Sequence, residues 1–345
     1  MSVVDAGRRK RALWTLVLTL VTIMSVAPMA LIARAQESTP TTDLSGLSGQ
    51  IEADGSSTVG PITESAAEDF AKAGAKDVEI SVGISGTGGG FERFCNDETD
   101  ISDASRAIKA EEAQKCADKG VDYYSFEVGS DGITVVVNKE NDFLTCVSTD
   151  QLKQLWSENR EATTFADLNP DYPGDDVALY GPGPDSGTFD FFNETILGAD
   201  VLPTTEYTPS EDDNVLVEGV AGDKNALGYF GYAYYAENED TLTALGVATK
   251  GDLSDCVTPS PDTIRDGSYP LARPLFIYVK ADSIQRTEVQ EFVRFYINNA
   301  EKIVTESDFV PQPEEVYRAD SQKIEAAIGG SAAPDGPNAA ATPAP

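Results

Sequence analysis

The chain has 345 residues, of which 25 are basic, 58 are acidic and none is histidine, and its formal net charge is −33. The length allows two domains with a core each, and the ordinary apolar fraction of 41% indicates a mostly globular protein. So negative a charge argues against nucleic acid or an anionic membrane as a partner. The lack of histidine excludes a Ser-His-Asp catalytic triad.

The first 35 residues are predicted to be a secretion signal. Arg8 to Arg11 form a basic segment, residues 12–32 are almost wholly apolar, and Ala33-Arg34-Ala35 provides the small residues that a signal peptidase recognises. Cleavage before Gln36 removes five basic residues and one acidic residue, which leaves a net charge of −37. The alternative is an uncleaved membrane anchor, because the apolar run approaches the roughly 20 residues of a spanning helix. In both cases the body of the protein is expected outside the cytoplasm.

Two polar segments frame the predicted globular part. Residues 36–48 (QESTPTTDLSGLS) read as a linker, and residues 329–345 (GGSAAPDGPNAAATPAP) as a disordered, low-complexity tail. Apolar runs typical of buried strands occur at Val78–Ile84, Ile133–Asn138, Val177–Tyr180 and Leu275–Val279. Helical patterns occur at Thr63–Ala73, Ala110–Lys119, Thr149–Ser157, Val289–Asn299 and Glu314–Ile328. This alternation predicts α/β domains with mainly parallel sheets.

The four cysteines fit an oxidising compartment and allow three pairings. We favour Cys95–Cys116 and Cys146–Cys256, the first of which would close a short loop beside residues 100–106. A zinc site is the alternative. It is disfavoured because the chain has no C-x-x-C spacing and no histidine.

Short turns rich in glycine, serine and threonine follow four predicted strands and precede four helices. They are Gly55–Gly60 (GSSTVG), Ser85–Gly90 (SGTGGG), Ser105-Arg106 and Gly181–Thr188 (GPGPDSGT). In open α/β sheets, ligands bind at the carboxyl ends of strands, where such turns converge. Hydroxyls and free N–H groups at helix starts donate hydrogen bonds to anions, and glycine lets the backbone approach closely. The pattern predicts a site for a tetrahedral oxyanion.

Each turn taken alone is more often a helix cap than a ligand site. Their recurrence beside Arg106 favours the site. SGTGGG lacks the lysine of a nucleotide-binding P-loop. A Ser–Lys hydrolase around Ser57 or Ser186 stays formally open but has no recognisable motif.

In their order along the chain, these motifs resemble a known family, the periplasmic phosphate-binding proteins of bacterial phosphate ABC importers (PstS type, here its Ser-Arg subgroup). The resemblance runs from about residue 51 to 328 and is carried by GSSTVGPI, ISGTGGGFERF, SDASRAIK, DGITVVVNKEND, GPDSGTFDFF and VAGDKNALGYFGYAYY. It implies a type II periplasmic-binding-protein-like fold, in which crossing hinge strands join two α/β lobes. Lobe I is expected at residues 49–137 and 257–328, and lobe II at residues 138–256.

The resemblance also implies a set of phosphate ligands. Ser57 and Thr58 match the family's first contact turn, Thr87 matches the second, and the other lobe contributes Ser186, Gly187 and Thr188. Many members carry an arginine shortly before Ser-Gly-Thr, where this chain has Pro182. Arg106 is therefore the expected cation, because its planar guanidinium donates two hydrogen bonds at once and stays charged.

In this family an aspartate accepts the proton of HPO4²⁻, which excludes sulfate. Ser105 stands where many members have that aspartate, and we expect Ser105 to contact phosphate. Asp131 is the first candidate for the acceptor and Asp103 the second. For both aspartates, the alternative is a purely structural role in a turn or helix cap.

The implied function is that of a receptor, not an enzyme. It would capture inorganic phosphate in an interlobe cleft, without cofactor or metal, and deliver it to the membrane permease and ATPase of an ABC importer. A monomer is expected. The alternatives are a receptor for another oxyanion (sulfate, molybdate, arsenate or a phosphonate), a phosphatase-like hydrolase, and a signalling or adhesive surface protein.

Overall fold

The computed structural model of the chain describes residues 43–184, 186–198 and 200–335. The predicted signal (1–35), the start of the linker (36–42) and the end of the tail (336–345) lie outside these residues. Within the described ranges, no helix combines the length and the apolar character that crossing a membrane requires.

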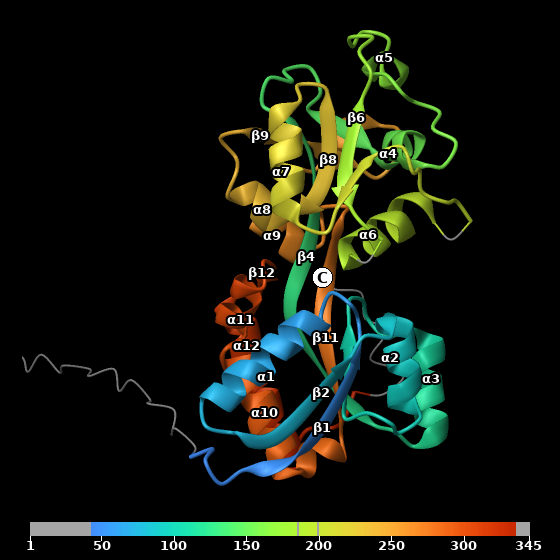
Figure 1. The fold of residues 1–345 in the computed structure, drawn as a ribbon. Helices are drawn as coiled ribbons and strands as arrows, with labels where there is room; N and C mark the ends of the chain where they lie inside the picture. Colours follow the sequence, from blue (N-terminus) through green and yellow to red (C-terminus); the bar gives the residue numbers. More distant parts are fainter. Residues whose placement is uncertain (1–42, 185, 199, 336–345) are drawn as a thin grey trace, which may run out of the picture. The chain divides into compact units, whose positions relative to one another are not determined.

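The first part of the fold consists of three strand–turn–helix units (Figure 1). They are β1 (Ser48–Gly55) with α1 (Gly60–Lys72), β2 (Asp77–Gly83) with α2 (Gly86–Cys95), and β3 (Ile101–Ala104) with α3 (Ala110–Lys119). Strand β1 lies between β2 and β3 and is parallel to both. Helix α1 begins before the predicted Thr63 because Pro61 is tolerated in a first helical turn.

A second set of strand–helix units follows further along the chain. It comprises β6 (Ala178–Pro182) with α6 (Gly187–Phe192) and a π-helical turn (Asn193–Leu197), β7 (Thr208–Ser210) with α7 (Asp213–Gly222), and β8 (Ala226–Gly231) with α8 (Tyr232–Ala236). Strand β6 is parallel to β7 and β8. Smaller elements complete this part: β5 (Cys146–Ser148), α4 (Thr149–Trp156), α5 (Phe165–Leu168), β9 (Leu242–Ala244), β10 (Gly246–Ala248) and α9 (Pro261–Arg265).

Two long strands connect the two sets. Strand β4 (Tyr123–Asn138) leaves the first set and enters the second, and β11 (Ala272–Lys280) returns beside it in the antiparallel direction. The main strand order is β2-β1-β3-β11-β4-β8-β6-β7. The expectation of mainly parallel sheets therefore holds for the outer strands only. Strand β4 runs from the first set to the second and β11 runs back, so the two strands are antiparallel to each other. For the same reason β11 is antiparallel to β3, and β4 is antiparallel to β8.

The chain ends in helices that pack on the first set. They are α10 (Thr287–Asn298), α11 (Ala300–Glu306) and α12 (Glu314–Ile328), with the short strand β12 (Val310–Pro311) between the last two. Strand β12 pairs with β4 at Gly129 and Ser130. The predicted range of the last helix agrees with α12.

Buried apolar side chains form two main clusters, and each cluster is the core of one lobe. Lobe I is the part around Phe70 and Phe292, and lobe II is the part around Trp156. The cluster of lobe II includes Ile264, Tyr269 and Leu271, although the predicted boundary places residues from 257 onward in lobe I. The structure differs there because α9 packs on lobe II before the chain enters β11.

Both predicted disulfides are confirmed. Cys95–Cys116 joins α2 to α3, and Cys146–Cys256 joins β5 to the segment after β10. The second bridge closes a loop 110 residues long. Because its loop is longer, the second disulfide lowers the conformational entropy of the unfolded chain more than the Cys95–Cys116 disulfide does.

The two polar segments are ordered where they adjoin the fold. Leu44 and Leu47, in the predicted linker, pack against the apolar cluster of lobe I. In the predicted disordered tail, Asp335 accepts hydrogen bonds from Lys323 Nζ at 2.6 Å and from the backbone N–H of Ser125 at 2.8 Å. Residues 329–335 thus differ from the expected disorder, because the partly buried ion pair of Asp335 with Lys323 holds this low-complexity segment against the fold.

Candidate functional site

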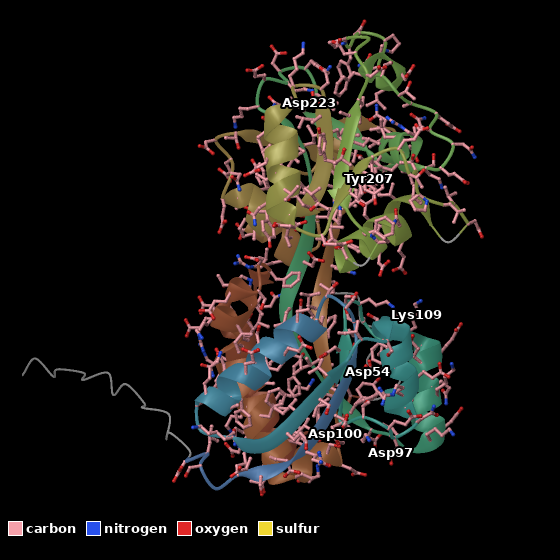
Figure 2. All side chains as sticks on the ribbon, in the orientation of Figure 1. Asp54, Asp97, Asp100, Lys109, Tyr207 and Asp223 are labelled. Atoms are coloured by element: carbon pink, nitrogen blue, oxygen red, sulfur yellow. A yellow bond between two sulfur atoms is a disulfide. The ribbon has the colours of Figure 1, made fainter. Side chains whose placement is uncertain are left out.

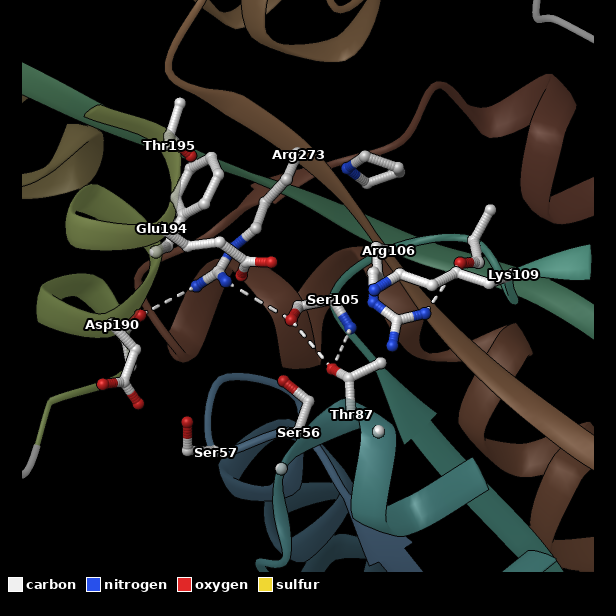
Figure 3. Close-up of a pocket in the computed structure, with 16 residues that line it drawn as sticks. Ser56, Ser57, Thr87, Ser105, Arg106, Lys109, Asp190, Glu194, Thr195 and Arg273 are labelled. Carbon is white, nitrogen blue, oxygen red and sulfur yellow. Dashed lines mark hydrogen bonds between the residues drawn. The ribbon is translucent and has the colours of Figure 1, made fainter. Parts of the chain in front are cut away.

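The predicted turns converge on a cavity of about 500 Å³ between the lobes (Figure 3). In the structure each turn joins a strand to a helix, as the sequence predicts. Lobe I contributes Ser56, Ser57, Gly86, Thr87, Gly88, Ser105, Arg106, Ala107 and Lys109 to the cavity lining. Lobe II contributes Gly187, Asp190, Phe191, Glu194 and Thr195, and strand β11 adds Arg273 and Pro274.

The turn between β1 and α1 is held by its own serine. Ser56 Oγ accepts hydrogen bonds from the N–H groups of Thr58 at 3.2 Å and Val59 at 3.4 Å. The Ser56 N–H donates to the carbonyl of Asp103 at 2.9 Å, which fixes the turn to strand β3. The Ser56 hydroxyl therefore stabilises the backbone of the turn. Ser57, the next residue, lines the cavity as well.

A pair of hydroxyls joins two turns of lobe I. Thr87 Oγ1 lies 3.1 Å from Ser105 Oγ and accepts a hydrogen bond from the Ser105 N–H at 3.2 Å. The pair places the glycine-rich turn of α2 beside the end of β3. Both hydroxyl hydrogens can rotate, so either oxygen can donate to an anion in the cavity.

Asp54, labelled in Figure 2, lies near the end of β1 and bonds to the glycine-rich turn. Its buried carboxylate accepts a hydrogen bond from the Ser85 N–H at 3.0 Å and forms an ion pair with Arg93 of α2. Burial alone would raise the pKa of Asp54. The hydrogen bonds from Arg93 and Ser85 together outweigh burial and lower it.

Asp54→Asn is therefore expected to destabilise the protein by about 1–3 kcal/mol at pH 7, because a buried partner of Arg93 loses its charge. The folded pKa lies below the unfolded value, so the stabilisation is present above about pH 4 and is lost as pH falls through the folded pKa. Urea unfolding at pH 7 and at pH 3 measures the difference. Asp77→Asn, at an exposed carboxyl, is the control. An equal loss at both pH values would contradict the ion-pair account.

The cation at the centre of the site is Arg273, which the sequence analysis missed. Its NH2 donates to Thr58 Oγ1 of lobe I at 2.7 Å and to the carbonyl of Gly187 of lobe II at 3.1 Å. Its NH1 donates to Ser105 Oγ at 3.3 Å. The guanidinium also lies 4.2 Å from the centre of the Phe191 ring. One side chain on a crossing strand thus contacts the binding turns of both lobes.

Asp131 holds Arg273 in place. The two residues face each other across β4 and β11, and Asp131 Oδ2 accepts from Arg273 Nε at 3.0 Å. Only 3% of the Asp131 side chain and 11% of the Arg273 side chain are exposed, so the pair is almost fully desolvated. Asp131 lies behind Arg273 and not in the cavity lining.

Asp103, the second candidate proton acceptor, is also outside the cavity lining. It is completely buried and accepts a hydrogen bond from Thr63 Oγ1 at 2.8 Å. Burial raises the pKa of Asp103 to about 7. The carboxylates in the lining are Asp190 and Glu194.

Arg106 lines the cavity, but Glu112 already binds its guanidinium. NH1 donates to Glu112 Oε2 and NH2 to Glu112 Oε1, both at 2.8 Å. Its charge is thus balanced within lobe I by two hydrogen bonds, and it interacts with Glu194 of lobe II electrostatically. Its predicted role as the main phosphate cation stays a prediction, and Arg273 is the stronger candidate.

The lobe II side begins with the cap of α6. Ser186 Oγ accepts from the Thr188 N–H at 3.1 Å, so this serine acts as the helix cap here. Gly187 lies directly against lobe I, since a Cβ at this position would be 2.5 Å from Thr58 Oγ1 and 3.0 Å from Ser57 Oγ. Of the ligands predicted in lobe II (Ser186, Gly187 and Thr188), Gly187 lines the cavity.

The chain is similar to known proteins over most of its length. The family model of the PBP superfamily domain matches residues 38–300. The phosphate-binding protein PstS of Staphylococcus saprophyticus is 40% identical over 282 residues, which cover 81% of this chain and 86% of that protein. The chain belongs to the PstS-type family of phosphate-binding proteins. Another member, protein SphX of Synechococcus elongatus, is 43% identical over 288 residues, which cover 83% of this chain and 84% of SphX.

Solved structures of the phosphate-binding family share the fold. The crystal structure of a possible phosphate binding protein from Planctomyces limnophilus is 40% identical, with a TM-score of 0.77, and the match covers 82% of this chain and 99% of that one. A putative phosphate ABC transporter substrate-binding protein with bound phosphate, from Clostridium perfringens, is 23% identical with a TM-score of 0.53. That match covers 77% of this chain and 100% of that one. The type II periplasmic-binding-protein-like fold is thereby confirmed.

Proposed function

We propose that this protein is an extracytoplasmic receptor that captures inorganic phosphate between its lobes and delivers it to an ABC permease. The observation that carries the proposal is the convergence of the hydroxyl-rich turns of lobe I and the Gly187 turn of lobe II on Arg273. The relative named phosphate-binding protein PstS and the phosphate-bound structure named as a phosphate ABC transporter protein support it.

Short-range donors hold the anion in this proposal. The hydroxyls of Ser57 and Thr87 and the N–H groups of residues 86–88 come from lobe I, and the Arg273 guanidinium provides the positive charge. Hydrogen bonds between an ionised donor and an anion are about twice as strong as neutral ones. Because salt screens exposed charges beyond about 8–10 Å, the acidic surface does not prevent binding.

Arg106 has a secondary role in this account. Its guanidinium stays paired with Glu112 at the edge of the cavity, whereas Arg273 contacts the anion. Asp131 stays the proposed acceptor of the phosphate proton, and this role requires phosphate binding to expose its carboxylate beside Arg273, because Asp131 does not line the cavity in the present structure. Asp131→Asn should then lower the preference for phosphate over sulfate.

Capture involves a hinge motion in which the lobes close on phosphate about β4 and β11. The contact of Gly187 with Thr58 supports this part of the proposal, since it is a direct contact between the lobes beside the cavity. We further propose that the protein binds phosphate without transforming it, and that the permease and its ATPase are separate proteins.

Calorimetric titration of phosphate-stripped protein with phosphate and with sulfate tests the function. We expect saturable binding of phosphate and little binding of sulfate. Equal binding of both anions would favour a general oxyanion receptor. Turnover of p-nitrophenyl phosphate that is lost in Ser57→Ala would instead show a hydrolase.

A further inference from the structure

A second tie between the lobes lies away from the phosphate cavity. The Tyr234 hydroxyl, on α8 of lobe II, donates a hydrogen bond to Asp308 Oδ2 at 3.0 Å. Asp308 lies between α11 and β12, in the part of the chain that packs on lobe I. Neither residue lines the cavity. In Figure 1, α8 and α11 are drawn to the left of β4, and α6 and α2, which border the cavity, are drawn to its right.

Hydrogen bonds within lobe I hold the backbone at Asp308. Asp308 has a φ of +64°, in the left-handed region that aspartate enters more readily than most residues. Its N–H donates to the carbonyl of Thr305, and the N–H of Phe309 donates to the carbonyl of Val304. These bonds close the loop after α11 and hold the backbone that carries the carboxylate acceptor.

The loop that contains Asp308 lies at the boundary between the two lobes. Phe309 packs against the apolar cluster of lobe I, and the next residue, Val310, belongs to the cluster of lobe II. Val310 pairs with Ser130 of β4, one position before Asp131, which holds Arg273. A rotation about the crossing strands that separates Gly187 from Thr58 therefore also moves Tyr234 relative to Asp308.

Tyr234 is suited to this contact because it brings a neutral donor to an acidic region. Asp212 and Asp213, at the start of α7, lie near enough to act on it electrostatically. Burial and the hydrogen bond to Asp308 raise the pKa of Tyr234 to about 12, so the hydroxyl keeps its proton at neutral pH. The donor is thus available across the physiological pH range.

We propose that Tyr234 and Asp308 form a latch that favours the conformation in which Gly187 contacts Thr58, and so increase phosphate affinity without touching phosphate. The affinity effect rests on the proposed function. A bond made in one of two conformations shifts their populations by its own differential free energy. The latch acts on the equilibrium between conformations and not on the anion.

The test compares Tyr234→Phe, Asp308→Gly and the double variant with the wild type. Glycine suits the left-handed backbone at position 308, and Tyr235→Phe, which removes a hydroxyl within lobe II, is the matched control. We expect Tyr234→Phe and Asp308→Gly each to weaken phosphate binding by about fivefold to tenfold, through faster release. The double variant should lose no more than either single variant, because the two residues share one bond.

Asp308→Asn should keep near-wild-type affinity, since the amide oxygen still accepts from Tyr234. Wild-type affinity in Tyr234→Phe, or losses that add up in the double variant, would overturn the latch. Small-angle X-ray scattering without phosphate tests the conformational shift separately, and Tyr234→Phe should show the larger radius of gyration. If the wild type fails to bind phosphate, the proposed function fails, and scattering still decides on the latch: equal radii would overturn it.

Discussion

Arg273→Met is expected to abolish measurable phosphate binding, and Arg106→Met to weaken it much less. Arg273 provides the charge-assisted donors at the centre of the seat, whereas Glu112 already neutralises Arg106. Loss of two such hydrogen bonds corresponds to about 3–5 kcal/mol, or a weakening of roughly 10²–10³-fold or more. Calorimetric titration with phosphate measures both variants.

One control separates the loss of binding from a loss of folding. Arg273→Met alone leaves the buried Asp131 carboxylate without its partner, which lowers the free energy of unfolding. Arg273→Met combined with Asp131→Asn removes both charges and should restore the unfolding midpoint but not phosphate binding. Arg318→Met, at an exposed arginine of α12, should bind phosphate like the wild type. If Arg106→Met abolished binding while Arg273→Met retained it, the assignment of the central cation would be wrong.

Gly187→Ala is expected to weaken phosphate binding by at least about tenfold while leaving the protein stable. The new Cβ would lie 2.5 Å from Thr58 Oγ1, so the lobes could not approach as closely as they do here. Within the first turn of α6, alanine is a better helix residue than glycine, so stability should not fall. Calorimetry gives the affinity, and thermal unfolding without phosphate gives the stability.

Gly222→Ala is the matched control, because a Cβ at the end of α7 meets nothing within 4 Å. It should bind phosphate like the wild type. Wild-type affinity in Gly187→Ala would show that the contact with Thr58 does not belong to the phosphate-bound conformation. An affinity loss accompanied by an equal loss in Gly222→Ala would point to a general effect of the added methyl group.

The turns that line the cavity could be predicted from the sequence because their signals are local. Glycine, serine and threonine within a few residues of Thr87 or Gly187 mark a strand end and a helix start. The bond between Arg106 and Glu112 is also local, since the same glutamate accepts from the Lys109 N–H at the start of α3. The available signal was a glutamate in the first turn of α3, six residues after Arg106 and within reach of its guanidinium.

Arg273 could not be identified in the same way. Its partner Asp131 lies 142 residues earlier, and Thr58 lies 215 residues earlier. The contact depends on the register of two antiparallel strands, which places Arg273 directly opposite Asp131. The available signal was an arginine within the otherwise apolar run from Leu271 to Leu275, where a charge needs a buried partner.

The lobe boundaries were harder to predict for a related reason. The chain returns to lobe I through β11 at Ala272 and not at residue 257, because α9 buries Ile264 in the cluster of lobe II. Composition does not distinguish these two destinations for a five-residue helix with one buried apolar side chain. Tertiary packing alone decides between them.

A crystal structure with bound phosphate decides whether Arg273 is the cation that holds the anion. We expect phosphate oxygens within hydrogen-bond distance of the Arg273 guanidinium, of Ser57 or Thr87 in lobe I, and of the Gly187 turn in lobe II. Phosphate bound at Arg106 and Lys109 alone, with every present contact of Arg273 unchanged, would contradict it.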